Sequence, residues 1–225
     1  MNKTLIKKRN IIYQSAKLFY YKGYKNTGIS DIISECKIAK GSFYYYFKSK
    51  DELLIEVIEY HTEKLINFFN VTVDDLSILK LKIFFEKFFN NIEYNRFHGG
   101  SPLGNLASEL SDINDKARIH LIDSYHKIEQ RISFFLATLQ YYQQEKYSSI
   151  EPELYARILI SLLEGTMLKI KTERNNDSVI DFLNFFDRMF SVSQLWIYEK
   201  FLFNWETLLT KKENFLKFRF PFLYL

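Results

Sequence analysis

Small, hydroxylated and basic side chains crowd one short stretch of the chain, at Lys40, Gly41, Ser42, Tyr44 and Tyr45. A lysine can donate a hydrogen bond to a guanine edge or to a phosphate, and serine and tyrosine hydroxyls can reach phosphate oxygens. A glycine among them lets the backbone approach another surface closely. Where such a stretch begins a helix, the free N–H groups of the first turn also favour phosphate. The residue types and their spacing therefore indicate contact with a nucleic acid.

Charge is divided unevenly around this stretch. Residues 1–50 carry 11 lysines and arginines against 2 acidic residues, a net charge of +9, whereas residues 51–225 carry 20 against 25, a net charge of −5. A basic N-terminal part on a mildly acidic remainder is typical of a polyanion-binding module joined to something else. The alternative that charge alone leaves open is a solvated basic face.

Three helical segments are expected to position these side chains. The first covers 3–22, where apolar residues recur every three or four positions. The second begins after Thr27, which we expect to be its N-cap. The third covers about 40–47 and turns Phe43 and Phe47 inward, so that the lysine, serine and tyrosine side chains face outward or sideways. Two short helices with a tight connection are the pattern of a helix-turn-helix.

This part of the chain resembles the N-terminal domain of the tetracycline-repressor (tetR) family. The resemblance rests on I-x-x-x-A-x-L-F-x-x-x-G-Y-x-x-T, then I-x-D-I, then K-G-S-F-Y-x-Y-F-x-S-K-x-x-L, which begin at Ile12, Ile29 and Lys40. It implies a three-helix DNA-binding domain over 1–50, with its helix-turn-helix at about 28–47. The expected DNA-binding residues are Thr27, Gly28, Lys40, Gly41, Ser42, Tyr44, Tyr45 and Lys50. Two positions depart from the family pattern: Lys37 stands where glycine is frequent, and Ala39 where serine often caps the recognition helix.

The remainder of the chain is also expected to be helical. Only 7 glycines and 3 prolines interrupt 225 residues of which 47% are apolar, and the apolar residues keep a helical period. Helices are expected over 51–70, 77–96, 103–110, 115–147, 151–174 and 177–193. The predicted fold class is therefore all-α, with the small DNA-binding domain followed by a larger effector-binding and dimerisation domain over 51–195.

A break rich in glycine, GGSPLGNLASELSD from Gly99, resembles a subgroup of the same family in which a helix at this point lines an effector pocket. Many relatives carry cysteine where this chain has Ser101, which disfavours a thiol-based sensor here. The expected ligand-binding residues are Phe84, Phe88, Leu103, Leu106, Tyr125 and Glu129. Tyr125 and Glu129 would give a mostly apolar pocket its polar groups, although salt bridges or hydrogen bonds inside the body explain them equally well.

The last two expected helices would form a homodimer interface, as the resemblance implies. The expected interface residues are Leu154, Ile158, Ser161, Leu162, Gly165, Leu183, Phe186 and Phe190. Small side chains at Ser161 and Gly165 would permit close helix approach. The alternative is ordinary packing within one chain, but dimeric helix-turn-helix proteins need an interface somewhere.

Several other classes of protein are disfavoured. A lone cysteine, Cys36, excludes an internal disulfide and is most simply a small core side chain. His120 and His126 are about 240° apart on a helix and cannot share a metal. No paired carboxylates or activated nucleophile stands out, and Asn105 replaces the lysine that a phosphate-binding loop needs. We therefore expect no enzyme, no cofactor and no metal.

Nothing in the sequence reads as a signal peptide or a membrane span, so the expected location is the cytoplasm and a membrane partner is disfavoured. Residues 196–225 hold both tryptophans and extend past the usual end of the family. They could cover a groove, meet a membrane surface or form a tail.

Two hypotheses follow from the sequence. The first is a repressor that binds double-stranded operator DNA as a homodimer and is released by a small apolar or aromatic effector. The second is a DNA-binding protein without small-molecule control that recruits a protein or a membrane through the aromatic C-terminal extension.

Overall fold

The computed structural model describes residues 3–94 and 97–191, and in these ranges the regular structure is helical throughout. The helices are α1 (Lys3–Lys22), α2 (Ile29–Cys36), α3 (Lys40–Tyr46), α4 (Lys50–Thr72), α5 (Ile78–Tyr94), α6 (Pro102–Leu110), α7 (Asp115–Tyr142), α8 (Gln144–Tyr147), α9 (Pro152–Glu173) and α10 (Asp177–Phe190). This confirms the predicted all-α fold class. Residues 1–185 form one compact unit and residues 186–225 a second, and the predicted extension at 196–225 lies outside the described residues.

We call the first three helices, residues 3–47, the head. Phe43 and Phe47 are buried, as predicted, and they pack with a ring-centroid distance of 5.9 Å. Burying one such side chain contributes about 1.5–3 kcal/mol relative to leaving it exposed. Because α3 has only seven residues, these two anchors hold it more than its own helix propensity does.

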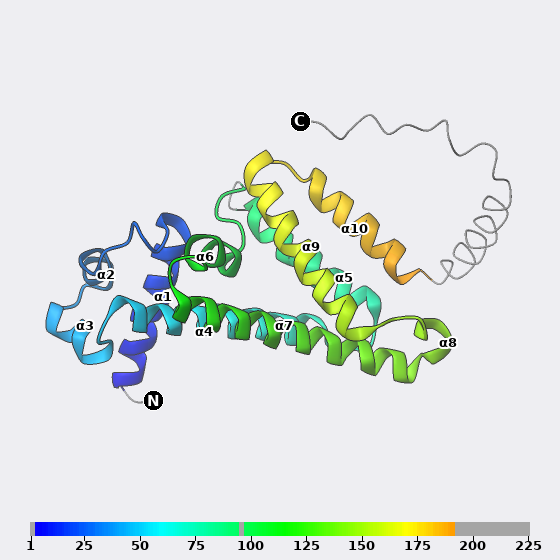
Figure 1. The fold of residues 1–225 in the computed structure, drawn as a ribbon, viewed down its shortest axis with the longest axis horizontal. Helices are drawn as coiled ribbons and strands as arrows, with labels where there is room; N and C mark the ends of the chain where they lie inside the picture. The colour runs from blue at the N-terminus through cyan, green and yellow to red at the C-terminus, as the bar shows by residue number, and fades with distance from the viewer. Residues whose placement is uncertain (1–2, 95–96, 192–225) are drawn as a thin grey trace. The chain divides into compact units, whose positions relative to one another are not determined.

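The helices from α4 to residue 185 form what we call the body. Figure 1 shows α4 leading from the head into the body, where it lies along α7, and α9 crossing in front of α5. Phenylalanine rings fill the centre of the body: Phe84 lies 5.1 Å from Phe69, and Phe182 lies 5.0 Å from Phe85, centroid to centroid. None of the helices in the described ranges combines the length and the apolar run that crossing a bilayer requires.

The region over 115–147, predicted as one helix, forms two helices, α7 and α8. The expected helix over 115–147 breaks at Gln143, so that α7 ends and α8 begins around a non-helical residue. The amide of Gln140 explains the break, because its Nε2 lies 2.8 to 3.2 Å from the carbonyl oxygens of Tyr147, Ser148 and Ile150. These hydrogen bonds satisfy carbonyls that a continuing helix would have satisfied itself.

Candidate DNA-binding surface and ligand cavity

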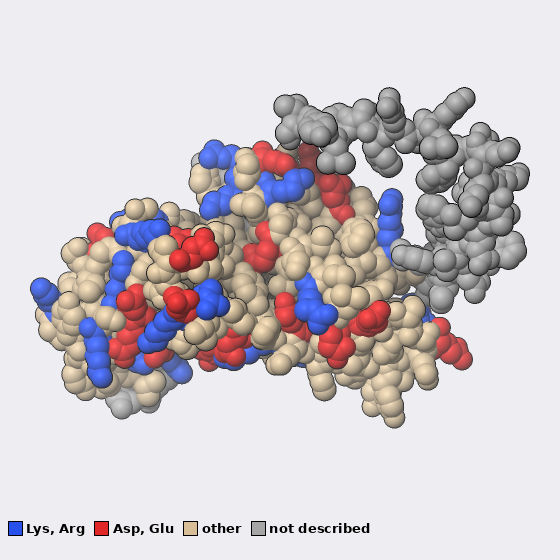
Figure 2. Space-filling model, viewed as in Figure 1, with Lys and Arg blue, Asp and Glu red and all other residues tan. Residues whose placement is uncertain are grey.

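The outward side of α3 carries the side chains that the sequence predicted for DNA contact. Lys40, Gly41, Ser42, Tyr44 and Tyr45 are all exposed. Tyr45 keeps 74% of its surface accessible, which is a large exposed area for an aromatic side chain. Figure 2 shows lysine and arginine side chains projecting from the outer edge of the head, with carboxylates interspersed behind them. The structure thus brings five of the eight predicted DNA-binding residues together on one short helix.

Gly41 stands open in this surface. A Cβ added to it would meet no atom within 4 Å, so nothing inside the protein requires a glycine at this position. The first turn of α3 also lacks a side-chain cap, because Ala39 occupies the N-cap. A glycine at an open position of this kind would allow another surface to approach the backbone closely, and contact of Gly41 with DNA remains a prediction.

Lys37 closes the turn between α2 and α3 in a left-handed conformation, with φ 51° and ψ 49°. This conformation costs a non-glycine residue about 1–2 kcal/mol, whereas a glycine adds roughly 0.4–1 kcal/mol of chain entropy to the unfolded state. We therefore expect Lys37→Gly to raise the free energy of unfolding by about 0.5–1 kcal/mol, measured by urea denaturation. Lys48→Gly is the control, because Lys48 is exposed without a positive φ. An increase from Lys48→Gly as well would contradict the backbone explanation.

Thr27 does not cap α2, which corrects the sequence prediction by one residue. Gly28 is the N-cap, and its N–H donates to the Asp31 carboxylate at 2.8 Å. Thr27 is fully buried, and its hydroxyl donates to the carbonyl oxygen of Gly23 at 2.7 Å. The hydroxyl points toward the end of α1 and not toward α2, because the turn after α1 leaves the Gly23 carbonyl oxygen within hydrogen-bonding distance. Contact of Thr27 and Gly28 with DNA remains a prediction.

Lys50 holds the connection between α1 and α2. Its ammonium donates to the carbonyl oxygens of Tyr24 and Thr27, each at 2.9 Å, and lies 4.0 Å from the centre of the Tyr24 ring. Two of its three N–H groups are thereby used. Only the third N–H group of Lys50 is available for a contact with DNA, and that contact remains a prediction.

Helix α6 of the body also binds the connection between α1 and α2. The Glu109 carboxylate accepts hydrogen bonds from the backbone N–H groups of Tyr24, at 2.9 Å, and Lys25, at 2.6 Å. Gly23 makes the approach possible, since it takes a φ of +84° and a Cβ there would lie 3.3 Å from Glu109. Hydrogen bonds to a charged group contribute about 1.5–3 kcal/mol each. The C-terminal end of α6 is therefore firmly attached to the head.

Tyr24 makes a second link between the head and the body. Its hydroxyl donates to the Asp51 carboxylate, which also accepts from the Asn114 amide at 3.3 Å. Asn114 is in turn the N-cap of α7. Burial, the hydrogen bond to Asp51 and the charges of Asp51 and Glu109 raise the pKa of Tyr24 above its ordinary value, so the phenol stays protonated and remains the donor.

A cavity of about 480 Å³ lies where the head meets the body. Its walls come from α1, α4, α5, the N-terminal end of α6, and α9, and aromatic side chains from α1 and α4 make up much of them. This volume lies within the range of about 300–1,000 Å³ typical of small-molecule sites. Phe88 and Leu103, two of the predicted ligand-binding residues, line it. The α1 side chains Tyr13 and Tyr20 also line it, so the head itself forms part of the wall.

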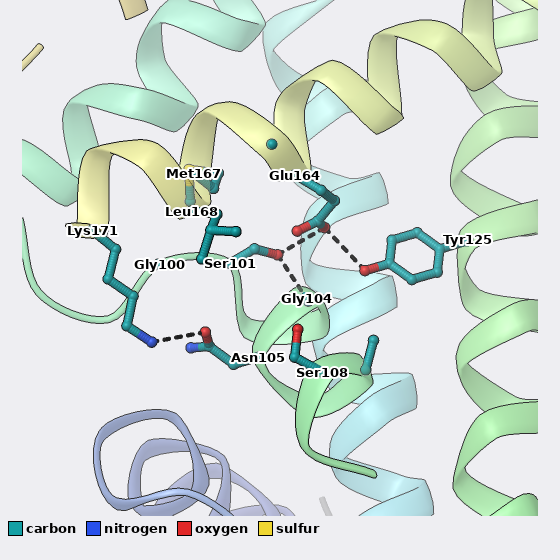
Figure 3. A pocket seen from close by; sticks show the side chains of 12 residues that line it. Gly100, Ser101, Gly104, Asn105, Ser108, Tyr125, Glu164, Met167, Leu168 and Lys171 are labelled. Atoms are coloured by element: carbon teal, nitrogen blue, oxygen red, sulfur yellow. Dashed lines mark hydrogen bonds between the residues drawn. The ribbon is translucent and has the colours of Figure 1, made fainter. Parts of the chain in front are cut away.

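A glutamate on α9, Glu164, borders this cavity and two smaller ones of about 290 and 350 Å³. Figure 3 shows its carboxylate pointing from α9 toward Ser101 and Tyr125. The Ser101 hydroxyl donates to Oε1 at 2.8 Å and the Tyr125 hydroxyl donates to the same oxygen at 3.2 Å. Burial raises the pKa of Glu164, while these two hydrogen bonds act in the opposite direction. The pKa of Tyr125 is raised by burial and by Glu164.

Ser101 also starts α6. It is the N-cap of that helix and accepts from the N–H of Gly104 at 3.1 Å. One end of α6 thus lies on the cavity through Ser101, and the other end holds the head through Glu109. Ser101 therefore has a structural role as the N-cap of α6, and this role does not require the cysteine that many relatives carry at this position. The lone thiol, Cys36, has its pKa raised by burial and by Glu35 to about 11, which keeps it protonated and unreactive.

The remaining predicted ligand residues divide into two groups. Tyr125 and Glu129 line the cavity of about 350 Å³ on the side of α7. Phe84 and Leu106 are buried among apolar neighbours of the core. Three further residues, Glu164, Tyr20 and His61, border the largest of these cavities. They were not among the ligand-binding residues predicted from the sequence. Burial and the nearby Lys64 lower the pKa of His61 to about 4, so its imidazole is neutral at physiological pH.

The predicted interface residues of α9 form an accessible, mostly apolar stripe. Leu154, Ile158 and Leu162 are half-buried, while Ser161 and Gly165 are exposed. Leu168 continues the stripe with 65% of its surface accessible, and a Cβ on Gly165 would meet no atom within 4 Å. Figure 2 shows an uncharged surface over the middle of α9, with charged side chains toward both of its ends. Large exposed apolar patches of this kind mark interaction sites.

The predicted interface residues of α10 are less uniform. Leu183 is half-buried in the first compact unit, beside the exposed Phe185. Phe186 and Phe190 belong to the second unit, where they are buried and their rings lie 4.7 Å apart. A role of these three residues in a dimer remains a prediction.

Comparison with known proteins agrees with this architecture. Residues 11–57 match the family described as "Bacterial regulatory proteins, tetR family", and residues 77–186 match "Tetracyclin repressor-like, C-terminal domain". An HTH-type transcriptional regulator in the lacX 3′ region of Lactococcus lactis is 30% identical over 172 residues, which cover 75% of this chain and 85% of that protein. The HTH-type transcriptional repressor DhaR of a Mycobacterium species is 26% identical over 180 residues, covering 78% and 88%.

Solved structures show the same arrangement of helices. A regulatory protein TetR from Rhodobacter sphaeroides superposes with a TM-score of 0.73 at 25% identity, covering 81% of this chain and 97% of that one. The reduced form of Escherichia coli NemR, at 20% identity, has a TM-score of 0.71 and covers 83% and 98%, and it supports the fold alone. With a matching head, a matching body and a relative of this similarity, the chain belongs to the tetR family of helix-turn-helix transcriptional regulators.

Proposed function

We propose that this protein is a transcriptional repressor that binds operator DNA as a homodimer and leaves it when a small molecule enters the cavity between head and body. The observation that carries the proposal is the composition of that cavity, whose walls come from α1 of the head and from α4, α6 and α9 of the body. A molecule that contacts both parts can change how they sit together. The proposed role as a repressor rests on the similarity to DhaR, which is named a transcriptional repressor.

Helix α6 provides a route from the cavity to the head. A ligand that displaces Ser101 or Glu164 acts on the first turn of α6, and Glu109 at the far end holds the backbone of Tyr24 and Lys25. A ligand shifts the position of the head only if it binds the two arrangements with different affinities. Contacts to α1 and α9 at once supply that difference, because their separation changes when the head moves.

DNA binding is assigned to the exposed side of α3, with Lys40, Ser42, Tyr44 and Tyr45 on the major groove and its phosphates. A dimer that joins through α9 would present two such helices to half-sites about 34–36 Å apart, or a multiple of that spacing. Operator affinity would then fall steeply with salt, because each phosphate contact releases counterions.

Operator affinity tests the proposal. Labelled DNA from the promoter of the chain's own gene is titrated with protein by fluorescence anisotropy, alone and with a panel of aromatic amines, alcohols and acids. We expect at least one compound to weaken the operator complex by a factor between about 5 and 150, the usual range of allosteric coupling. No preference of the protein for promoter DNA over random DNA would contradict the DNA-binding assignment.

Glu109→Gln tests the route through α6. A glutamine can accept only one of the two backbone N–H groups and its amide nitrogen repels the other, so the head is held less firmly. We expect the compound that releases the wild type to have a coupling factor close to one in this variant, measured by the same anisotropy titration. Glu59→Gln is the control, since Glu59 pairs with Lys127 inside the body and its loss should leave the response unchanged. A normal response from Glu109→Gln would place the coupling elsewhere.

The second hypothesis, recruitment of a protein or membrane through residues 196–225, falls outside the described residues. Deleting residues 211–225 separates it from the first. Operator binding and ligand release should both survive the deletion if the cavity controls the head.

A further inference from the structure

The chemistry of the cavity between head and body identifies the class of molecule that it takes, on the basis of the proposed function. We propose that the effector is an organic cation with an aromatic or apolar body, whose charged nitrogen pairs with the free oxygen of Glu164.

The first support is the bonding of the Glu164 carboxylate. Both of its hydrogen bonds, from Ser101 and from Tyr125, go to Oε1. Among the side chains that the structure describes, in 4–90 and 97–191, none donates a hydrogen bond to Oε2 and no lysine, arginine or histidine forms an ion pair with Glu164. Carboxylates in such partly buried places are ordinarily paired. Glu164 thus has an unused acceptor.

The second support is the position of that acceptor. Oε2 lies against Gly104, where an added Cβ would overlap it. In the described part of the chain, the fully buried side-chain oxygens that lack a hydrogen-bond partner belong to Gln14, Ser15 and Ser178. Oε2 of Glu164 is not among them, so it is not fully buried. Oε2 therefore lies beside the cavity of about 290 Å³, which Gly104 and Glu164 both line. This cavity adjoins the large aromatic cavity, because Ser101 and Glu164 line both. Lys171 also lines this smaller cavity, and its ammonium donates to Asn105 at 3.1 Å, as Figure 3 shows.

The third support is the lining of the large cavity. Rings of Tyr13, Tyr20, Tyr60, Phe68 and Phe88 surround it. Aromatic faces attract cations, with about 0.5–1 kcal/mol at exposed sites and about 2 kcal/mol or more when water is excluded. The same rings bury the apolar body of a ligand. A carboxylate that borders an aromatic cavity selects an apolar cation over a neutral or anionic molecule of the same shape.

Other charges around the cavity do not reverse this preference. Lys17 and Lys64 are exposed, and exposed charges contribute only about 0–1 kcal/mol to a pair. His61 is neutral at physiological pH because burial and Lys64 lower its pKa to about 4. Burial raises the pKa of Glu164, and a bound cation would counter this by stabilising the ionised form.

A series of matched compounds tests the proposal: 2-naphthylmethylamine, 2-naphthylmethanol and 2-naphthoic acid, which share one ring system and differ in charge. Isothermal titration calorimetry on the full chain should show the amine binding most tightly. In Glu164→Gln the amine should lose about 10- to 100-fold in affinity, as expected when one partner of a partly buried charge pair is neutralised, while the alcohol should change less than about threefold.

The variant should remain folded. Glutamine keeps an acceptor for Ser101 and Tyr125 and removes a charge that is disfavoured in this place, so its melting temperature should equal or exceed that of the wild type. Glu173→Gln is the matched control, a glutamate on the same helix that pairs at 3.6 Å with Lys169. It should bind the amine as the wild type does.

The outcomes separate this inference from the proposed function. If the amine binds through Glu164 but leaves operator affinity unchanged, the ligand class stands and control of DNA binding fails. If the alcohol or the acid binds more tightly and releases the operator, the proposed function stands and the cationic class is overturned. The inference is also overturned if the amine binds equally well to Glu164→Gln, or if it does not bind at concentrations up to about 1 mM.

Discussion

Replacing Gly99 by alanine is expected to lower the free energy of unfolding by about 3 kcal/mol. Gly99 takes a φ of +105°, a conformation that side-chain-bearing residues adopt at a cost of roughly 1–3 kcal/mol. The added methyl group would also overlap the hydroxyl and ring of Tyr20. That ring cannot give way freely, because its hydroxyl donates to the Gly100 carbonyl at 3.0 Å. Strain and lost packing therefore add at this one position.

Thermal denaturation checks this result, and for a chain of this length 3 kcal/mol corresponds to a fall of roughly 6–12 °C in melting temperature. Gly41→Ala is the matched control, since the same methyl group would meet no atom within 4 Å there. Its stability should be unchanged or higher by up to about 1 kcal/mol, the helix propensity that alanine gains over glycine. A Gly99→Ala protein as stable as the wild type would show that Tyr20 does not occupy the place described.

Replacing Gly165 by leucine is expected to convert the dimer into monomers without weakening the protomer. The position is exposed on α9 and an added Cβ would meet no atom of the protomer within 4 Å. Leucine is also a better helix former than glycine by up to about 1 kcal/mol. If a partner helix packs closely over Gly165, however, the leucine side chain occupies the space that the partner needs.

Sedimentation velocity at about 10 μM would report the change in mass. Operator affinity should fall by about 10²-fold or more with it, because two linked heads gain that much from binding together. Lys116→Leu adds a similar apolar side chain at an exposed position of α7 and should remain dimeric. A Gly165→Leu protein that is still a dimer would remove α9 from the interface.

The helices could be predicted from the sequence because their causes are local. Apolar residues at helical spacing and the few glycines and prolines predicted α1 with both of its ends, and Phe43 and Phe47 were predicted to face inward. The break at Gln143 could not be predicted in this way. It depends on Gln140 folding over to carbonyls seven to ten residues later, and such a turn leaves no periodic signal.

The centre of the candidate ligand site could not be predicted for a related reason. A single glutamate within the amphipathic α9 resembles a solvated surface residue. Its hydrogen-bonding partners Tyr125 and Ser101 are 39 and 63 residues away, so only the fold shows that they converge. Glu109 is similar, since it binds backbone groups 84 and 85 residues earlier. A sequence motif was informative for the candidate DNA-binding surface because the predicted contact residues of α3 lie within a few consecutive positions.

The most direct measurement of the proposed control is the affinity of a ligand for the free protein and for the operator-bound protein. The compound of the naphthalene series that binds most tightly would be titrated into each by calorimetry. Because coupling between two binding sites is reciprocal, the operator should weaken ligand binding by the same factor by which the ligand weakens operator binding, between about 5 and 150. Equal affinity of the ligand for both forms would show that the cavity does not control the DNA-binding head.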